Sequence, residues 1–141
     1  MAAELFVDTS GWYPVVVRTQ PEHAALTRAL RDRVRAGARV VTTNLVVAET
    51  HVLLLRRVGR ETAMAFVRGV GEPPNLVVAS TGELEVAAVR NWLERFDDQW
   101  FSFTDAVSFA VMAERGITEA LALDRHFSAA GYRTVPVSRA G

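Results

Sequence analysis

The chain has 141 residues, a length that suits one domain, so we expect residues 1–141 to form a single domain. Sixteen basic and sixteen acidic residues give a formal net charge of +0, so the chain as a whole does not attract nucleic acid. The absence of cysteine excludes disulfides, zinc thiolates and thiol nucleophiles. Every basic residue is arginine, which excludes any mechanism that needs a lysine.

Composition also indicates where the protein acts. Half of the residues are hydrophobic, as expected for a chain with a packed core rather than a disordered one. No apolar run reaches the roughly 18 residues that a membrane span requires. The first residues do not place a basic patch before an apolar stretch, as a secretory signal does. We therefore expect a cytoplasmic protein that does not contact a membrane.

Five short apolar runs, each continuous rather than alternating, predict strands that are covered on both faces. These strands are expected at Leu5–Val7, Arg39–Thr43, Asn75–Ser80, Glu119–Leu123 and Arg133–Val137. Apolar residues at helical spacing predict helices over Glu22–Ala36, Asn44–Val58, Glu61–Val70, Glu83–Phe96 and Thr104–Arg115, with a short helical turn after Asp124. Strands that alternate with helices predict an α/β fold, with a parallel sheet and helices on both of its faces.

The first expected strand ends on a carboxylate, Asp8, in the sequence FVDTSGW. Asp8 or Ser10 could cap a helix beginning near Trp12, because their oxygens accept the free N–H groups of a first helical turn. In a parallel sheet, however, ligands bind at the carboxyl ends of strands, where the strand order reverses. Asp8 therefore has two possible roles, helix cap and ligand.

The first expected helix, Glu22–Ala36, carries three arginines on one stripe: Arg28, Arg31 and Arg35. These side chains could contact phosphates. A charged stripe is more commonly a solvated helix face, and that is the interpretation we favour from the sequence.

Glu49 lies early in a strongly apolar helix, in the sequence NLVVAETHVLLL. Its neighbours at helical spacing are apolar: Leu45, Val46, Val52 and Leu53. A carboxylate in such surroundings is costly unless it is paired, and Arg56 lies about 10 Å away along the helix axis. Glu49 is therefore a candidate site residue.

Two further acids lie at the ends of expected elements. Asp105 follows Ser102 in WFSFTDAVSF, which matches a helix capping box. Asp124 ends the apolar strand EALALD, as Asp8 ends the first strand, and it could cap the turn that follows. If both strands belong to one parallel sheet, Asp8 and Asp124 share an edge.

Convergence of these acids would require that their repulsion be relieved. Two carboxylates about 4 Å apart repel by roughly 4 kcal/mol at an effective dielectric near 20. Several such pairs would exceed the marginal stability of a domain, so some carboxyls are protonated or a cation lies among them. Oxygen ligands without histidine or cysteine suit Mg²⁺ or Mn²⁺, and such an ion supports phosphodiester hydrolysis.

Four segments together resemble the PIN-domain ribonucleases, in particular the VapC-type toxins of bacterial toxin–antitoxin pairs. They are FVDTSGW with Asp8, NLVVAET with Glu49, FSFTDAVSFAVMAERG with Asp105, and ALALDRHFSAAGY with Asp124. The resemblance implies that these four acids are metal ligands and water activators. It further implies lesser roles for Thr9, Ser10, Asn44, Thr104 and Asp98.

The resemblance also implies an α/β/α sandwich with a five-stranded parallel sheet. The implied activity is Mg²⁺- or Mn²⁺-dependent endonucleolytic cleavage of single-stranded RNA. The implied partners are a small cognate antitoxin and a second copy of the chain in a homodimer. The sequence leaves open two alternatives: a PIN-like module that binds RNA or protein without catalysis, and an RNA-processing nuclease that is not a toxin.

Other families with acids at strand ends fit less well. Phospho-accepting receiver domains and haloacid-dehalogenase phosphatases both use a lysine near the phosphate, and this chain has none. A P-loop enzyme is excluded by the absence of G-x-x-x-x-G-K. We treat His51 and His126 as structural, because neither has a partner at H-x-x-x-H spacing.

Overall fold

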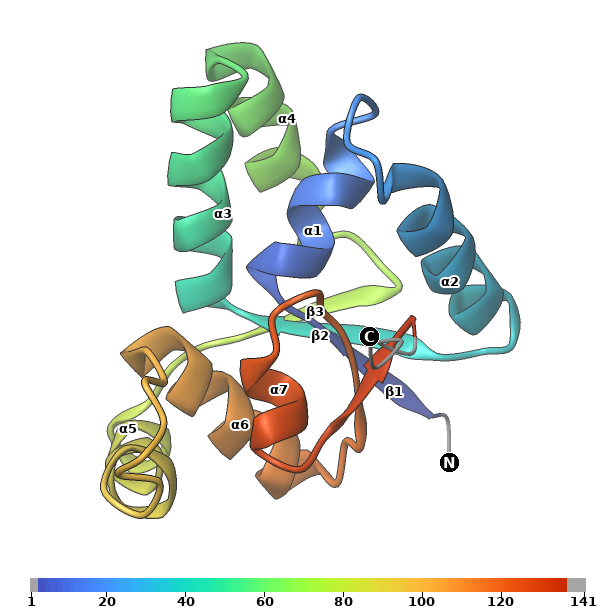
Figure 1. Cartoon of the computed structure of the whole chain (residues 1–141). Helices are drawn as coiled ribbons and strands as arrows, with labels where there is room; N and C mark the ends of the chain where they lie inside the picture. The colour runs from blue at the N-terminus through green and yellow to red at the C-terminus, as the bar shows by residue number, and fades with distance from the viewer. Residues whose placement is uncertain (1–2, 137–141) are drawn as a thin grey trace.

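The computed structural model describes residues 3–136 and contains one parallel five-stranded sheet (Figure 1). The strand order is β3-β2-β1-β4-β5, with β1 in the centre. Phe6 of β1 pairs with Val41 of β2 on one side and with Ala120 of β4 on the other. The strands are β1 (Glu4–Val7), β2 (Arg39–Thr43), β3 (Asn75–Val78), β4 (Glu119–Leu121) and β5 (Arg133–Val135).

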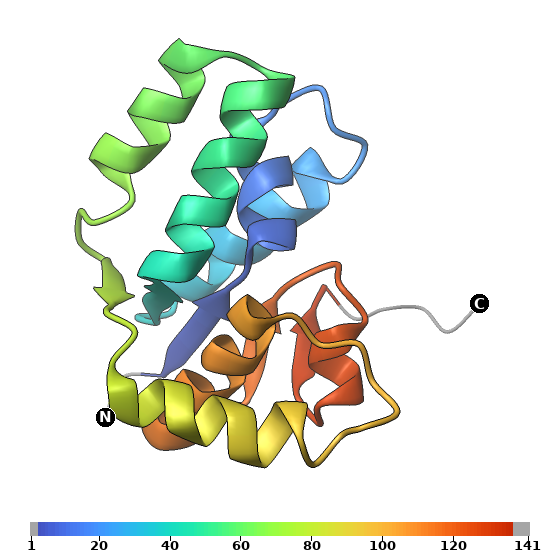
Figure 2. The same cartoon turned by 90° about the vertical axis from the view of Figure 1, so that its left-hand side faces the viewer.

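Helices cover both faces of the sheet, which confirms the expected three-layer sandwich. Figures 1 and 2 show α1 to α4 on one face and α5 to α7 on the other. Their bounds are α1 Thr9–Val16, α2 His23–Arg35, α3 Asn44–Arg57, α4 Arg60–Gly69, α5 Gly82–Ala88, α6 Phe103–Arg115 and α7 His126–Ala129. Within residues 3–136, none of these helices is long and apolar enough to cross a membrane.

Several boundaries differ from the sequence-based expectation. The helix expected over Glu83–Phe96 is instead α5 followed by one π-helical turn, η1 (Val89–Leu93). The third and fourth strands are shorter than expected, and Val137, the end of the fifth expected strand, lies outside the described residues. Helix α1 begins at Thr9, whereas the sequence suggested a helix beginning near Trp12 and only as one of two explanations for Asp8.

Helix α1 forms because tertiary contacts compensate for weak helix-forming residues. It contains a glycine and Pro14, both unfavourable in helix interiors. A Cβ at Gly11 would collide with the carbonyl oxygen of Leu121, so the glycine allows α1 to lie directly against the end of β4. The buried Trp12 ring meets Phe66 of α4 edge-on at 5.7 Å, and its Nε1 donates to the Thr42 hydroxyl over 3.4 Å. α1 is therefore fixed to both β4 and α4.

An aromatic cluster fills the other face of the sheet. Phe109 of α6 packs edge-on against Phe127 at 4.9 Å and against Phe101 at 5.0 Å. Phe127 also stacks on Phe6 of the central strand at 6.0 Å. Residues 105–112 of α6 are buried, so the first turn of this helix is held firmly beside the carboxyl ends of β1 and β4.

Candidate metal centre

Asp8 immediately follows β1, at the point where the strand order reverses between β1 and β4. It is the N-cap of α1: its Oδ2 accepts the Ser10 backbone N–H over 3.2 Å and the Ser10 hydroxyl over 2.8 Å. The residue is only 3% exposed. The capping role that the sequence suggested is therefore present, at the sheet edge where ligands bind.

Asp105 is fixed in the same way at the start of α6. Its Oδ2 accepts the Ser102 backbone N–H over 3.2 Å, and its own N–H donates to the Ser102 hydroxyl over 3.0 Å. This reciprocal pair is the capping box expected from the sequence. Asp105 is 7% exposed, and its negative charge raises the pKa of Asp8, so the two carboxylates are close.

Asp124 lies beyond the end of β4, and the His126 ring contacts both Asp124 and Asp105. Its Oδ1 accepts the backbone N–H of His126 over 2.9 Å. The His126 Nδ1 lies 3.0 Å from Asp105 Oδ2 and 3.4 Å from Asp124 Oδ1. Ligand atoms of these three residues all lie within 4.8 Å of one another.

His126 is the site residue that sequence reasoning missed. We expected a structural role for His126 because the sequence has no second histidine one helical turn away from it. The usable signal was Asp124-Arg125-His126, because an aspartate readily accepts the backbone N–H two residues ahead. That turn places the His126 ring between the two carboxylates, where it also meets Phe101 edge-on at 5.4 Å.

Glu49 contributes from α3, but not in the environment predicted. The sequence suggested a carboxylate buried among apolar neighbours, whereas Glu49 is exposed, because it lies on the side of α3 that faces away from the core. In the described part of the chain it has no ion pair with Arg56. It lines a cavity of about 330 Å³ together with Asp8 and Asp124. We name this the acid cavity.

The two hydroxyls beside Asp8 act differently. Ser10 donates to Asp8, and its oxygen accepts the backbone N–H groups of Leu123 over 3.0 Å and Asp124 over 3.2 Å. It therefore ties the ends of β1 and β4 together at the site. The Thr9 hydroxyl points toward α3, where it accepts from the Thr50 hydroxyl over 3.1 Å, although Thr9 also lines the acid cavity.

The other three residues expected to support the site, Asn44, Thr104 and Asp98, make no side-chain hydrogen bond to its three aspartates within residues 3–136. The Asn44 Oδ1 accepts the Ser80 backbone N–H over 2.8 Å, which joins the start of α3 to the end of β3. Thr104 precedes Asp105 in α6, and its carbonyl accepts from Ser108. Asp98 is exposed in the loop before α6 and makes no side-chain hydrogen bond or ion pair within residues 3–136.

Burial makes the negative charge of Asp8 costly. Removal from water raises the pKa of Asp8 from 3.8 to about 7; the Ser10 hydrogen bonds oppose this shift, and the charge of Asp105 adds to it. A carboxyl with this pKa is half protonated near neutrality. A cation at the site would favour the ionised form, because opposite charge lowers a carboxyl pKa.

The hydrogen bonds leave one oxygen of each aspartate available. Within residues 3–136, donors occupy Asp8 Oδ2, Asp105 Oδ2 and Asp124 Oδ1, and leave Asp8 Oδ1, Asp105 Oδ1 and Asp124 Oδ2 without one. No arginine is ion-paired with these three aspartates in the same range. Fixed carboxylates that keep free oxygens and are not ion-paired with an arginine fit a hard divalent cation such as Mg²⁺ or Mn²⁺.

This fold and site agree with the family that the sequence matches. Residues 5–131 match the PIN domain family, so the chain belongs to that family.

Similar proteins include the "23S rRNA-specific endonuclease VapC20" of Mycobacterium tuberculosis, from strains CDC 1551 / Oshkosh and H37Rv. Each is 38% identical over 128 residues, which cover 91% of this chain and 95% of the relative. A crystal structure of Mycobacterium tuberculosis VapC20, described as a sarcin-ricin loop cleaving toxin, matches with a TM-score of 0.80 over the same shares of the two chains.

Proposed function

We propose that this protein is a divalent-metal-dependent endoribonuclease of the VapC type. The observation that carries the proposal is the arrangement of Asp8, Asp105 and Asp124. Each has one oxygen fixed by a backbone N–H group and the other without a donor in the described residues, near the switch point of the sheet. The similarity to VapC20, an endonuclease by name, supports the same conclusion.

The three aspartates would hold the cation, for which Mg²⁺ and Mn²⁺ are the candidates. When bound, such a cation neutralises charge on a phosphate and lowers the pKa of a bound water. Ser10 positions Asp8 and keeps β4 beside it. Glu49, on the exposed side of the acid cavity, is suited to accept a proton from the attacking water at its carboxylate.

Arg57 supplies positive charge near these acids. It lines the acid cavity from the last turn of α3, and its guanidinium lies 5.7 Å from the centre of the Tyr13 ring. A guanidinium stacked on an aromatic ring keeps its N–H groups available for a phosphate. We therefore expect Arg57 to contact the substrate backbone and Tyr13 to pack against an unstacked base.

The first substrate to test is the sarcin–ricin loop of 23S rRNA, because the VapC20 relatives are described as 23S rRNA-specific and as cleaving that loop. The proposal includes a cognate antitoxin partner, encoded alongside, and a homodimer. An RNA substrate of this kind places the activity in the cytoplasm.

Cleavage of an RNA fragment containing this loop, and of a single-stranded RNA pool, tests the proposal. The wild type and Asp8→Asn should be compared with Mg²⁺, with Mn²⁺ and with EDTA. Asparagine keeps the capping oxygen but removes the charge, so the fold should persist while activity falls by at least about a hundredfold. Equal activity in the two proteins, or activity in EDTA, would contradict the mechanism.

A wild-type protein that binds RNA but cleaves neither substrate would favour a PIN-like binding module. Cleavage without growth inhibition on expression would favour an RNA-processing nuclease over a toxin.

A further inference from the structure

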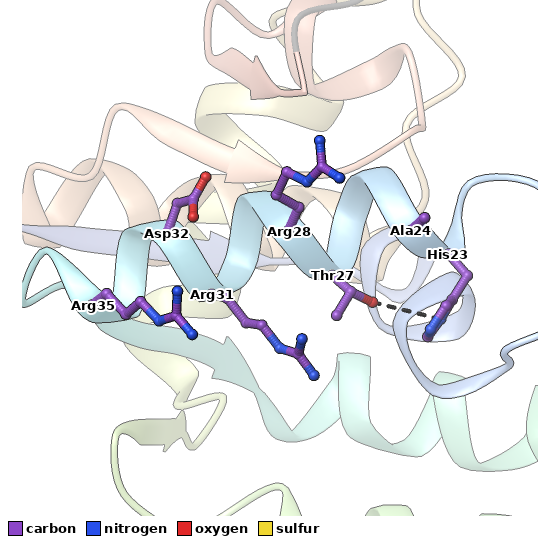
Figure 3. Close-up of a pocket in the computed structure, with 7 residues that line it drawn as sticks. All are labelled: His23, Ala24, Thr27, Arg28, Arg31, Asp32 and Arg35. Carbon is purple, nitrogen blue, oxygen red and sulfur yellow. Dashed lines mark hydrogen bonds between the residues drawn. The ribbon is translucent and has the colours of Figure 1, made fainter.

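One face of α2 carries a concentration of positive charge that the acid cavity does not use. Arg28, Arg31 and Arg35 are exposed along this helix, seven residues or about 10 Å from first to last. They line a cavity of about 510 Å³ (Figure 3). The remaining lining residues are His23, Ala24, Thr27 and Asp32. We name this surface the arginine face.

The arginines of this face have no internal partners. Elsewhere, Arg33 pairs with Glu119 at 3.1 Å and Arg115 pairs with Glu4 at 2.8 Å. Within residues 3–136, no carboxylate lies within ion-pair distance of any arginine of the face, Asp32 included. Three arginines and one aspartate give the face a formal charge of 3 − 1 = +2. An anion can therefore bind here without breaking a native ion pair.

Figure 3 shows how these side chains are arranged. Arg31 and Arg35 extend to one side of the helix, whereas Arg28 and Asp32 extend to the other. The guanidinium groups are thus spread along the helix rather than gathered on Asp32. Spaced guanidinium groups suit a polyanion with repeated charges, and each can hold a phosphate through two N–H groups.

The negative charge of the acid cavity gives a positive surface nearby a role in RNA binding. Phosphates approaching the acid cavity meet Asp8, Glu49 and Asp124, which repel them. A formal net charge of +0 provides no compensating attraction from the chain as a whole. Beyond the cation and Arg57 at the cavity itself, a local positive surface beside the acids would add affinity for the flanking phosphates of a longer RNA.

The arginine face and the acid cavity meet at the junction of α1 and α2. His23 lines the arginine face, and its Nδ1 lies 2.8 Å from the carbonyl oxygen of Pro14. Pro14 and Glu22, the residue before His23, line the acid cavity. A nucleic acid strand leaving the acid cavity on this side therefore reaches the arginine face directly.

We propose that the arginine face binds the phosphates of substrate RNA flanking the cleaved bond. This inference rests on the proposed ribonuclease function and adds to it the surface that holds the substrate. The arginine face would increase the affinity for RNAs long enough to extend beyond the acid cavity. It would not change the affinity for RNAs that occupy the acid cavity alone.

The test compares two full-length triple variants with the wild type. The first is Arg28→Gln, Arg31→Gln and Arg35→Gln; the matched control is Arg60→Gln, Arg68→Gln and Arg95→Gln, which removes the same charge from exposed positions elsewhere. Binding of labelled single-stranded RNAs of about 4 and about 16 nucleotides is measured by fluorescence anisotropy in EDTA, across a salt series. Cleavage of the shorter RNA with Mn²⁺ is measured in parallel.

Loss of the arginine face should weaken binding of the longer RNA about tenfold or more. The salt dependence, as log K against log salt, should become less steep by about 2, at about 0.7 per phosphate contact. Binding and cleavage of the shorter RNA should stay at the wild-type level, and the control should match the wild type throughout.

Two results would overturn the inference: unchanged binding of the longer RNA, and an equal loss in the control. Binding of a labelled poly-glutamate peptide is measured alongside, and if it weakens while RNA binding is unchanged, the face belongs to an acidic protein segment instead. A wild type that cleaves no RNA would contradict the ribonuclease proposal itself, while the anisotropy measurements would still report on the arginine face.

Discussion

At the scale of single residues, each aspartate of the site combines two roles that the sequence presented as alternatives. Asp8 caps α1, Asp105 completes the capping box of α6 by accepting the Ser102 backbone N–H, and Asp124 accepts the N–H of the turn that follows it. A cap fixes a carboxylate through one oxygen and leaves the other free, so capping orients a ligand instead of competing with it. The Asp→Asn change separates the two roles, because asparagine caps about as well as aspartate.

Ser10 is the residue whose loss should disturb the site without removing a charge. Ser10→Ala deletes the hydroxyl donor to Asp8, keeps the backbone N–H donor, and leaves the N–H groups of Leu123 and Asp124 without their acceptor. We expect a loss of about 1–2 kcal/mol in the free energy of unfolding and about 10- to 100-fold weaker metal binding. Denaturant unfolding and Mn²⁺ titration measure these effects.

The control for this prediction is Ser128→Ala. Among the described residues, the exposed hydroxyl of Ser128 donates only to the Arg125 carbonyl, over 2.9 Å, so both quantities should stay near the wild-type values. A loss of metal binding in this control equal to that in Ser10→Ala would contradict the role assigned to Ser10.

The raised pKa of Asp8 predicts a pH dependence of stability in the metal-free protein. The unfolded chain releases this proton near pH 3.8, whereas the folded protein holds it until about pH 7. Stability from this group is therefore complete below pH 3.8 and decreases as the pH rises through 7. The shift corresponds to at most about 4 kcal/mol.

Thermal unfolding in EDTA at pH 5 and pH 8 measures this dependence. Asp8→Asn lacks the titrating group, so its stability advantage over the wild type should be larger at pH 8. An advantage that shrinks as the pH rises would contradict the sign of the effect.

At the scale of elements, the position of α1 depends on one glycine. Gly11→Ala would place a methyl group against the Leu121 carbonyl, so α1 must move away from β4. We expect a loss of about 2 kcal/mol in stability, together with reduced activity because Asp8 and Ser10 move with the helix. Gly69→Ala in α4 is the matched control: nothing lies within 4 Å of its added methyl group, so it should be neutral or slightly stabilising. Equal effects of the two substitutions on unfolding would contradict this account.

The elements also show what could be read from the sequence. The strands and the longer helices were predictable because their apolar runs are continuous or follow helical spacing. For helix α1 the sequence suggested only that Asp8 or Ser10 could cap a helix beginning near Trp12. Its extent over Thr9–Val16 was not predictable, since its glycine, proline and β-branched residues disfavour a helix until Trp12 and Gly11 pack against distant segments. The π-helical turn after α5 likewise has no signal in the apolar spacing.

The three candidate aspartates were identifiable because each follows a strand or lies in the first turn of a helix, and Glu49 was identifiable because its neighbours at helical spacing are apolar. The exposure of Glu49 was not predictable, because it depends on how α3 is turned against the sheet. His126 depends on a turn that brings its ring back toward Asp105, 21 residues earlier in the chain. The local sequence signals the turn at Asp124, but it carries no signal for the contact of His126 with Asp105, which the sheet topology creates.

At the scale of the whole molecule, carboxylates gathered at one edge of the sheet link folding to cation binding. Repulsion among Asp8, Asp105 and Asp124 destabilises the metal-free fold, and a cation that binds only the folded protein offsets it. Mn²⁺ at about 100 times its dissociation constant should stabilise the protein by about 2.7 kcal/mol, which raises Tm by about 5–10 °C. EDTA should reverse the shift.

Two asparagine variants decide whether this shift comes from the site. Asp105→Asn removes one proposed ligand but keeps a side-chain oxygen that can accept the Ser102 backbone N–H, and Ser102 still caps α6, so the fold should persist while its Tm responds little to Mn²⁺. Asp98→Asn removes the same charge from an exposed loop position that makes no described side-chain contact, so it should respond like the wild type. Differential scanning fluorimetry with and without Mn²⁺ measures all three proteins. Equal shifts in the two variants would mean that the cation binds the surface at large, because only a built site distinguishes one carboxylate from another.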